Sequence, residues 1–344
     1  MNKVVTGALT PGSHLIDVAG VRQRYHVAGS GPVVLAHPGG PGLSYEYLRM
    51  PAAEQHLTMV YVEPIGTGAS GRLPAHPHGY TRERYARALD GLIEHLGVDR
   101  VHLLGHSHGG FVAQHYALTR PDVLAGVILY DSAPVTGADH FAEAARNMEA
   151  FARRNADRPE LPAVLATWQS LGGLSDDEGT TRAARGMLPA YLADYWDHQE
   201  EYAPLFSITG TFISGLDEQL VPDPIDDRAA LPAIRTPALV LAGRHDVICG
   251  PRWANELADG IPGAELVMLE NSGHLGHVEE PDAFTRAVTS FVLDGARTPP
   301  GRAPRTPNQQ NAVARTFGRA SAGTSPEYGL PERTSVRPES ERSA

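Results

Sequence analysis

The stretch LLGHSHGGFVAQHYAL, residues 103–118, decides the fold. Apolar residues run up to Gly105, and apolar residues at helical spacing follow Gly110, so the stretch predicts a buried strand that turns directly into a helix. Such a sharp turn strains its central residue, and only small neighbours leave room for the chain to pass. Gly105, Gly109 and Gly110 supply that room around Ser107. The pattern is that of the Gly-x-Ser-x-Gly nucleophile elbow, which lifts a serine hydroxyl above the end of a strand.

Predicted strands and helices alternate on both sides of this turn. The apolar stripe from Tyr85 to Leu96 is typical of a helix that ends at Gly97. Two stretches of alternating polarity meet at Ala19-Gly20 and predict an N-terminal antiparallel pair. Apolar runs of the buried-strand type occupy residues 32–36, 57–62, 101–104, 126–130, 238–243 and 265–270. The alternation predicts an α/β fold with a mostly parallel, doubly wound sheet.

The chain divides into three kinds of segment. Residues 135–228 are rich in Ala, Arg, Tyr and Trp, and predict several helices inserted as a cap between two strands of the sheet. The core is then built from residues 1–134 and 229–296. Residues 297–344 are rich in Arg, Pro, Ser and Gly and have too little apolar content for a core, so we expect a disordered tail.

Composition excludes several classes of function. Cys249 is the single cysteine among 344 residues, so neither an intramolecular disulfide nor a Cys-rich zinc site can form. A formal charge of -11 argues against binding nucleic acid through a basic surface. No run approaches the roughly 18 apolar residues of a membrane span, and the first residues lack the basic and apolar run that is typical of a secretory signal, so we expect none. We expect a soluble cytoplasmic protein, and the sequence leaves its oligomeric state open.

The serine hydroxyl needs a base, and the base needs an acid that orients it. In this architecture the order along the chain is Ser, then Asp or Glu, then His, each after a strand. Asp246 and His274 satisfy both the order and the context. The rivals are Asp131, which precedes the predicted cap, and two histidines that neighbour the chosen pair, His245 and His277.

Developing negative charge needs backbone N–H donors. The N–H of His108 opens the helix after Ser107, and a second donor is expected from the loop AHPGGPGLS at residues 36–44. His106 and His108 could suggest a metal site, but residues that flank a tight turn point in different directions. We therefore expect neither metal nor cofactor, and His106 as a wall of the pocket.

The sequence resembles the α/β-hydrolase superfamily over about residues 13–293, and within it the prolyl aminopeptidase (proline iminopeptidase) group. The motifs that carry the resemblance are HPGGPGLSYEYL, EPIGTGAS, GHSHGG, SITGTF at residues 207–212, GRHD and SGH. The resemblance implies Ser107 as nucleophile, Asp246 as acid, His274 as base, and the N–H groups of Gly39 and His108 as the oxyanion hole. It departs from the group at three positions, which are Pro38, Glu63 and Ile65.

The resemblance implies a serine aminopeptidase that releases an N-terminal residue, proline preferred, from a short peptide. The group holds the substrate's ammonium with glutamates of the cap, but Leu205 stands where one is expected. Glu201 is a candidate replacement, and Gly40, Trp196 and Phe206 are further candidates for contact with substrate. An alternative is an esterase, lactonase or amidase with an aromatic lid that also includes Trp168, Tyr191 and Tyr195. A second alternative is a non-catalytic ligand-binding member of the superfamily.

Overall fold

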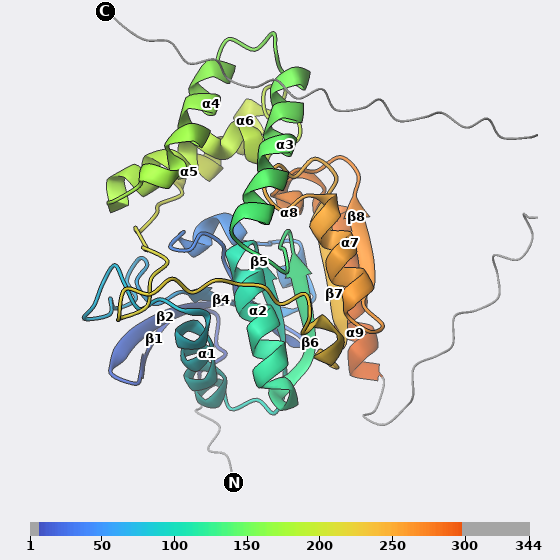
Figure 1. Cartoon of the computed structure of the whole chain (residues 1–344). Coiled ribbons are helices and arrows are strands. Elements are labelled where there is room, and N and C mark those ends of the chain that lie inside the picture. The colour runs from blue at the N-terminus through green and yellow to red at the C-terminus, as the bar shows by residue number, and fades with distance from the viewer. Residues whose placement is uncertain (1–6, 298–344) are drawn as a thin grey trace, which may run out of the picture. The chain divides into compact units, whose positions relative to one another are not determined.

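The computed structural model describes residues 7–297, whose strands form one eight-stranded sheet (Figure 1). The strands lie in the order β1-β2-β4-β3-β5-β6-β7-β8, and β2 is antiparallel to both of its neighbours while the remaining pairs are parallel. Their bounds are β1 Gly12–Val18, β2 Val21–Gly29, β3 Val33–His37, β4 Thr58–Glu63, β5 Val101–His106, β6 Leu124–Tyr130, β7 Ala238–Gly243 and β8 Glu265–Leu269. The predicted fold class, with its N-terminal antiparallel pair, is confirmed.

Helices cover both faces of the sheet because each inner strand is apolar on both sides. On β6, Val127 and Leu129 face the cluster that holds α1, α2 and α7, whereas Ile128 and Tyr130 face the cluster that holds α9. This alternation follows from the two-residue period of a strand. The covering helices are α1 Arg82–Leu96, α2 His108–Thr119, α7 Pro251–Gly260 and α9 Pro281–Arg297. The chain between β6 and β7 leaves the sheet from one strand and returns to the strand beside it.

Helix α1 shows how local sequence signals become structure. The Thr81 hydroxyl accepts a hydrogen bond from the Arg84 N–H at 3.2 Å, which caps the first turn. Gly97 ends the helix in the left-handed conformation, with a φ of 64°, as its position after the apolar stripe predicts.

Four α-helices lie between β6 and β7 in the chain and gather beyond the end of the sheet (Figure 1). We call them the cap helices, and they are α3 Ala138–Arg154, α4 Leu161–Ser170, α5 Asp177–Tyr191 and α6 Gln199–Tyr202. Residues 208–228, which we expected to share in the helical cap, form no helix but an extended path that bridges Leu43 through Gly210 and Val135 through Asp226. Prolines and glycines in this path disfavour a helix.

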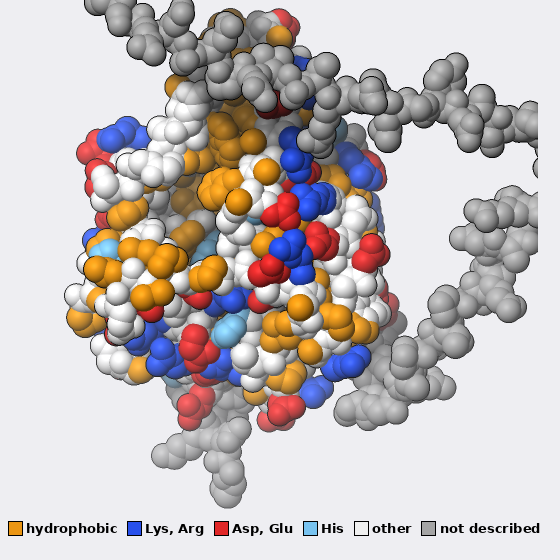
Figure 2. All heavy atoms as spheres, viewed as in Figure 1, with side chains coloured by type: hydrophobic (Ala, Val, Ile, Leu, Met, Phe, Trp, Pro, Cys, Tyr) orange, Lys and Arg blue, Asp and Glu red, His pale blue; other side chains and the backbone are white. Residues whose placement is uncertain are grey.

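Ion pairs join α3 to the sheet domain. Arg252 on α7 contacts Asp139 at 3.0 Å and Glu143 at 3.4 Å, and Arg228 contacts Asp139 at 3.0 Å. Figure 2 shows acidic and basic side chains interleaved between α3 and α7. Partly exposed ion pairs of this kind contribute little to stability, so we expect them to affect the orientation of α3 more than the free energy of unfolding.

Two predictions made from the sequence concern membrane spans and the C-terminal tail. Within residues 7–297, no helix combines the length and the apolar content needed to cross a membrane. Apart from Arg297, where α9 ends, the predicted tail at residues 297–344 lies outside the described residues.

Candidate active site

Ser107 occupies a strained turn between β5 and α2. Its φ of 53° and ψ of -117° are unusual for a residue with a side chain. The Ser107 N–H donates to the Tyr130 carbonyl at 2.9 Å, and the Ser132 hydroxyl donates to the Ser107 carbonyl at 3.0 Å. These bonds fix the turn against the end of the neighbouring strand β6 and the residues that follow it. The turn therefore presents Ser107 at the carboxyl end of the sheet, as the elbow motif predicts.

The glycines around Ser107 are required by close contacts. A Cβ on Gly105 would overlap the backbone of Gly109, and a Cβ on Gly109 would overlap the carbonyl of His37. A Cβ on Gly110 would overlap the side chain of Ser132. Gly105 and Gly109 thus let two backbone segments approach, and Gly110 leaves room for the Ser132 side chain.

We predict that Gly105→Ala destabilises the protein by about 3 kcal/mol, because the new methyl group meets rigid backbone rather than a side chain that can move. Gly172→Ala is a matched control, since no heavy atom lies within 4 Å of a Cβ built there. The control should change the free energy of unfolding by less than about 0.5 kcal/mol. Denaturant titration of both variants measures this. Equal midpoints for Gly105→Ala and wild type would contradict the close contact at the turn.

His274 and Asp246 form a buried pair at the same end of the sheet. His274 Nδ1 lies 2.8 Å from Asp246 Oδ2, while Asp246 Oδ1 accepts the N–H groups of Ile248 at 2.7 Å and Cys249 at 3.1 Å. A carboxylate accepts and cannot donate, so His274 carries a proton on Nδ1 and its Nε2 is free to accept one. In residues 7–297 no hydrogen bond joins this Nε2 to the Ser107 hydroxyl.

A chain of hydrogen bonds connects the loop after β3 to His274. The Gly39 N–H donates to the Tyr47 hydroxyl at 2.6 Å, and this hydroxyl donates to His106 Nδ1 at 2.8 Å. His106 Nε2 in turn donates to the His274 carbonyl at 2.9 Å. Burial holds the pKa of His106 well below its ordinary value, so the ring is neutral with its single proton on Nε2. Its two nitrogens are engaged beneath the turn rather than in the pocket.

The two loop glycines that we expected near the substrate, Gly39 and Gly40, differ in whether their N–H groups are already hydrogen-bonded. A Cβ on Gly39 would lie 2.8 Å from the Ser107 Cβ, so the loop passes directly over the serine. The Gly39 N–H, however, is already bound to Tyr47. Among residues 7–297 the N–H groups of Gly40 and His108 have no hydrogen-bond acceptor. Tyr47, on the 3-10 turn Tyr45–Leu48, accounts for this difference, and no sequence signal pointed to it.

The rival histidine His277 is held in place by other groups. Its Nε2 donates to the Tyr47 carbonyl at 2.7 Å, and its Nδ1 accepts the Tyr130 hydroxyl proton at 2.9 Å. Burial lowers the pKa of His277 to about 4. With both nitrogens engaged, His277 is unavailable as a base in place of His274.

Within the described residues, one group of potential metal ligands comes together, namely His106, Asp131 and His274, whose ligand atoms lie within 4.8 Å of one another. Both nitrogens of His106 already have partners, and His274 Nδ1 faces Asp246. The donor set that remains is one carboxylate oxygen and one imidazole nitrogen, which is fewer than the ligands of a protein zinc site. His108 does not belong to this group.

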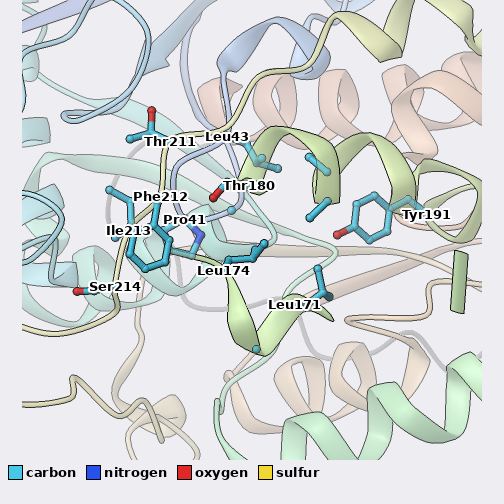
Figure 3. A pocket seen from close by; sticks show the side chains of 14 residues that line it. Pro41, Leu43, Leu171, Leu174, Thr180, Tyr191, Thr211, Phe212, Ile213 and Ser214 are labelled. Carbon is cyan, nitrogen blue, oxygen red and sulfur yellow. The ribbon is translucent and has the colours of Figure 1, made fainter. Parts of the chain in front are cut away.

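A pocket of about 390 Å³ opens between the loop after β3 and the cap helices (Figure 3). Its walls come from the loop, from the stretch between α4 and the end of α5, and from the extended path after α6. The lining residues are Gly40, Pro41, Leu43, Leu171, Gly172, Leu174, Thr180, Ala183, Ala184, Tyr191, Thr211, Phe212, Ile213 and Ser214. None of these is charged. The Tyr191 hydroxyl points into the space, and the Tyr191 carbonyl accepts the His274 N–H at 2.6 Å.

Three cap residues that we expected in the pocket are absent from its described lining. Trp196 stacks on Phe151 with ring centroids 5.8 Å apart. The Glu201 side chain is 63% exposed and lies 3.4 Å from His198 Nδ1. Phe206 is 37% exposed. The cap thus turns Tyr191, and not these residues, toward the loop that covers Ser107.

Comparison with known proteins extends over most of the described chain. Residues 32–281 match the model of a family described as alpha/beta hydrolase fold. A proline iminopeptidase of Clostridioides difficile is 27% identical over 299 residues, 79% of this chain and 95% of that protein. A protein of Stutzerimonas stutzeri, provisionally named a carbamate hydrolase, is 29% identical over 266 residues, 76% of this chain and 91% of that protein. A solved hydrolase from Pseudomonas aeruginosa superposes with a TM-score of 0.60 at 26% identity, over 81% of this chain and 98% of that one.

Proposed function

The chain belongs to the α/β-hydrolase fold family, and we propose that it is a serine hydrolase with Ser107 as nucleophile, His274 as base and Asp246 as the acid that orients the base. The observation that carries the proposal is the buried contact of 2.8 Å between His274 Nδ1 and Asp246 Oδ2, at the same sheet edge as the strained turn of Ser107. This contact leaves His274 Nε2 as a proton acceptor.

The reaction proceeds in two steps. His274 Nε2 takes the hydroxyl proton of Ser107 while the oxygen attacks the substrate carbonyl carbon, and the carbonyl oxygen becomes an oxyanion. The oxyanion collapses, the bond to the leaving group breaks, and His274 returns its proton to that group. Water then attacks the acyl-enzyme with His274 again as base, which releases the acid and restores Ser107.

We assign the oxyanion donors to the N–H groups of His108 and Gly40. Both are without an acceptor among the described residues, and Gly40 lines the pocket. The Gly39 N–H, the donor implied by the resemblance, is bound to the Tyr47 hydroxyl. Tyr47 then has a supporting role. Its bond to the Gly39 N–H fixes the loop, and the fixed loop places the Gly40 N–H where it can donate to the oxyanion.

The pocket walls support the substrate class that we propose. The fourteen described lining residues carry no charge, and their polar groups are hydroxyls and backbone atoms. An ammonium buried in such a pocket would lack a carboxylate partner, which is unfavourable. We therefore favour an uncharged acyl compound, namely an ester, lactone or amide of a small hydrophobic metabolite.

The second candidate is the aminopeptidase activity implied by the sequence motifs. The similarity to a proline iminopeptidase over 95% of that protein's length favours it. It would require an acid near the substrate's amino group, and Glu201 and Asp197 lie on the exposed side of the cap instead, with Asp197 paired to Arg158 at 3.0 Å.

Three substrates separate these candidates: p-nitrophenyl butyrate, proline p-nitroanilide and its N-acetylated form. We expect turnover of the ester, and a kcat/KM for the free-amine anilide that is no higher than that for its N-acetylated form, because the pocket offers no carboxylate to bind an ammonium. Initial rates at matched concentrations measure this. Cleavage of the free-amine anilide alone would establish the aminopeptidase instead.

A further inference from the structure

We propose that Asp131 is a positioning residue of this site, which carries a proton on Oδ2 and donates it in a hydrogen bond to the Asp246 carboxylate. The inference rests on the proposed function in one respect, which is that Asp246 orients His274. It gives the site a second acid with a role opposite to that of the first, because Asp131 donates where Asp246 accepts.

The sheet brings the two acids together. Asp131 directly follows β6, and its N–H donates to the Leu241 carbonyl on β7 at 2.8 Å. The Gly243 N–H, at the end of β7, donates to Asp131 Oδ1 at 2.8 Å. Asp246 follows Gly243 by three residues and contacts His274 Nδ1 at 2.8 Å, while a carboxylate oxygen of Asp131 lies within 4.8 Å of a ring nitrogen of the same histidine. The two carboxyl groups thus meet in the space that the ends of neighbouring strands enclose.

One oxygen of Asp131 has no donor. Asp131 is fully buried, and its Oδ2 has no hydrogen-bond partner among the described residues when both acids are treated as acceptors. Two carboxylates in contact repel each other, whereas one proton between them turns the contact into a hydrogen bond. A proton on Oδ2 therefore satisfies the buried oxygen and removes the repulsion together.

The donors around each acid decide which of them keeps the charge. Asp246 accepts three N–H groups, from Ile248, Cys249 and His274, whereas Asp131 accepts the single N–H of Gly243. Hydrogen bonds to a carboxylate favour its charged form, so the charge belongs on Asp246 and the proton on Asp131. Burial, and next the charge of Asp246, raise the pKa of Asp131 well above its ordinary value.

Among the described residues, the titratable groups that face Asp131 provide no fixed positive charge that would stabilise its ionised form. The titratable groups around it are Asp246, Cys249, Glu279, Tyr130, His106 and His274. His106 is neutral, and Glu279 adds a second acid whose pKa is raised to about 7. Among these groups, His274 alone gains a positive charge in the reaction, and it does so against Asp246.

The backbone of Asp131 gives a further reason to assign it a role. Its φ is 44°, a strained value for a residue with a side chain, and such strain persists where the surroundings demand it. Asparagine tolerates this conformation well and has nearly the same shape. Asp131→Asn therefore keeps both the turn and a donor toward Asp246, whereas Asp131→Ala keeps neither the donor nor the volume.

The donated bond also sets the basicity of Asp246. Without it, the Asp246 carboxylate attracts the His274 proton more strongly, and the charged form of His274 is favoured. Removing a charge from an ionised Asp131 would have the opposite effect, because the neutral form of His274 would then be favoured. The direction of the change thus reports the protonation state of Asp131.

The decisive experiment uses infrared difference spectra of the full-length wild type and Asp131→Asn. They are recorded at a pH above the pKa of Glu279, which burial raises to about 7, so that this second carboxyl group is ionised and adds no band. We expect the wild type to show the carbonyl stretch of a protonated carboxyl group that Asp131→Asn lacks. A spectrum in which this band is absent, or unchanged in the variant, overturns the proposal. The measurement needs no turnover, so it stands apart from any failure of the proposed serine hydrolase function.

The positioning role is tested by the pH dependence of inactivation by a fluorophosphonate probe. Asp131→Ala should react about ten-fold more slowly at the optimum, with the acid limb of its profile moved to higher pH, and Asp131→Asn should restore both. An Asp131→Ala profile equal to that of wild type overturns the role, and an acid limb moved to lower pH in Asp131→Asn overturns the proton assignment. If Asp131→Ala fails to fold, the Asn variant and the infrared band still decide.

Discussion

Replacing Ser107 with alanine is expected to lower kcat by about 10⁶-fold and to abolish covalent labelling by a fluorophosphonate probe. The expectation follows from the strained turn, which exposes this hydroxyl above the sheet and places it beside the loop that carries the free Gly40 N–H. The alanine methyl group fits the same space, so the variant should keep the fold. Gel detection of a labelled probe and a denaturant titration measure the two quantities.

A serine elsewhere on the cap provides the control for this variant. Ser207 is exposed, and its hydroxyl bonds to the Pro204 carbonyl within its own turn. Ser207→Ala should be labelled like the wild type. Labelling that persists in Ser107→Ala would assign the nucleophile to another residue, and a folded wild type that takes no label would favour a ligand-binding member of the family.

Most of the sheet could be predicted because buried strands are apolar on both faces. The run at residues 238–243 coincides with β7, Ala238–Gly243. The run at residues 101–104 is shorter than β5, because Gly105 and His106 are not apolar and still pair with Leu129 and Tyr130 of β6. Residues 208–228 were harder, since an extended path without a partner strand has no period that a sequence pattern can report.

The residues that we propose for the chemistry could be named from sequence because they follow strands directly, but contacts across the sheet could not be predicted. The order of Ser107, Asp246 and His274 follows from strand ends alone. The contact between Tyr47 and His106 joins positions 59 residues apart, and the contact between His106 and His274 joins positions 168 apart. Neither has a local signal. The occupied Gly39 N–H depends on the first of these contacts, so the sequence alone could not identify Gly40 as the free donor.

The Asp131 and Asp246 pair lies between these extremes. Both residues were recognised as following strands, and Asp131 was the weaker candidate for the acid because it precedes the predicted cap. The order of strands adds what was missing: β6 and β7 are neighbours, so their carboxyl ends deliver both acids to one place. An insertion between two strands separates residues in sequence and leaves them adjacent in space.

Asp246→Asn is expected to lower kcat by about 10⁴-fold with little change in KM. Asp246 Oδ1 accepts the N–H groups of Ile248 and Cys249, so the oxygen of the new amide must take that side. Its NH₂ group then faces His274 Nδ1 across the contact of 2.8 Å and needs an acceptor there. The proton of His274 moves to Nε2, the atom that has to take the proton of Ser107.

The loss thus comes from the wrong tautomer, and not from a lost fold or a lost pocket. Asp246 is buried behind His274 and does not line the described pocket, which is why KM should hold. The control is Asp259→Asn, the same change at an exposed position on α7, and it should match the wild type in steady-state kinetics. A decrease smaller than about ten-fold in Asp246→Asn would contradict the role of Asp246. It would leave Asp131, the other carboxyl group beside His274, as the acid that orients the base, and the double variant with Asp131→Asn would then lose the remaining activity.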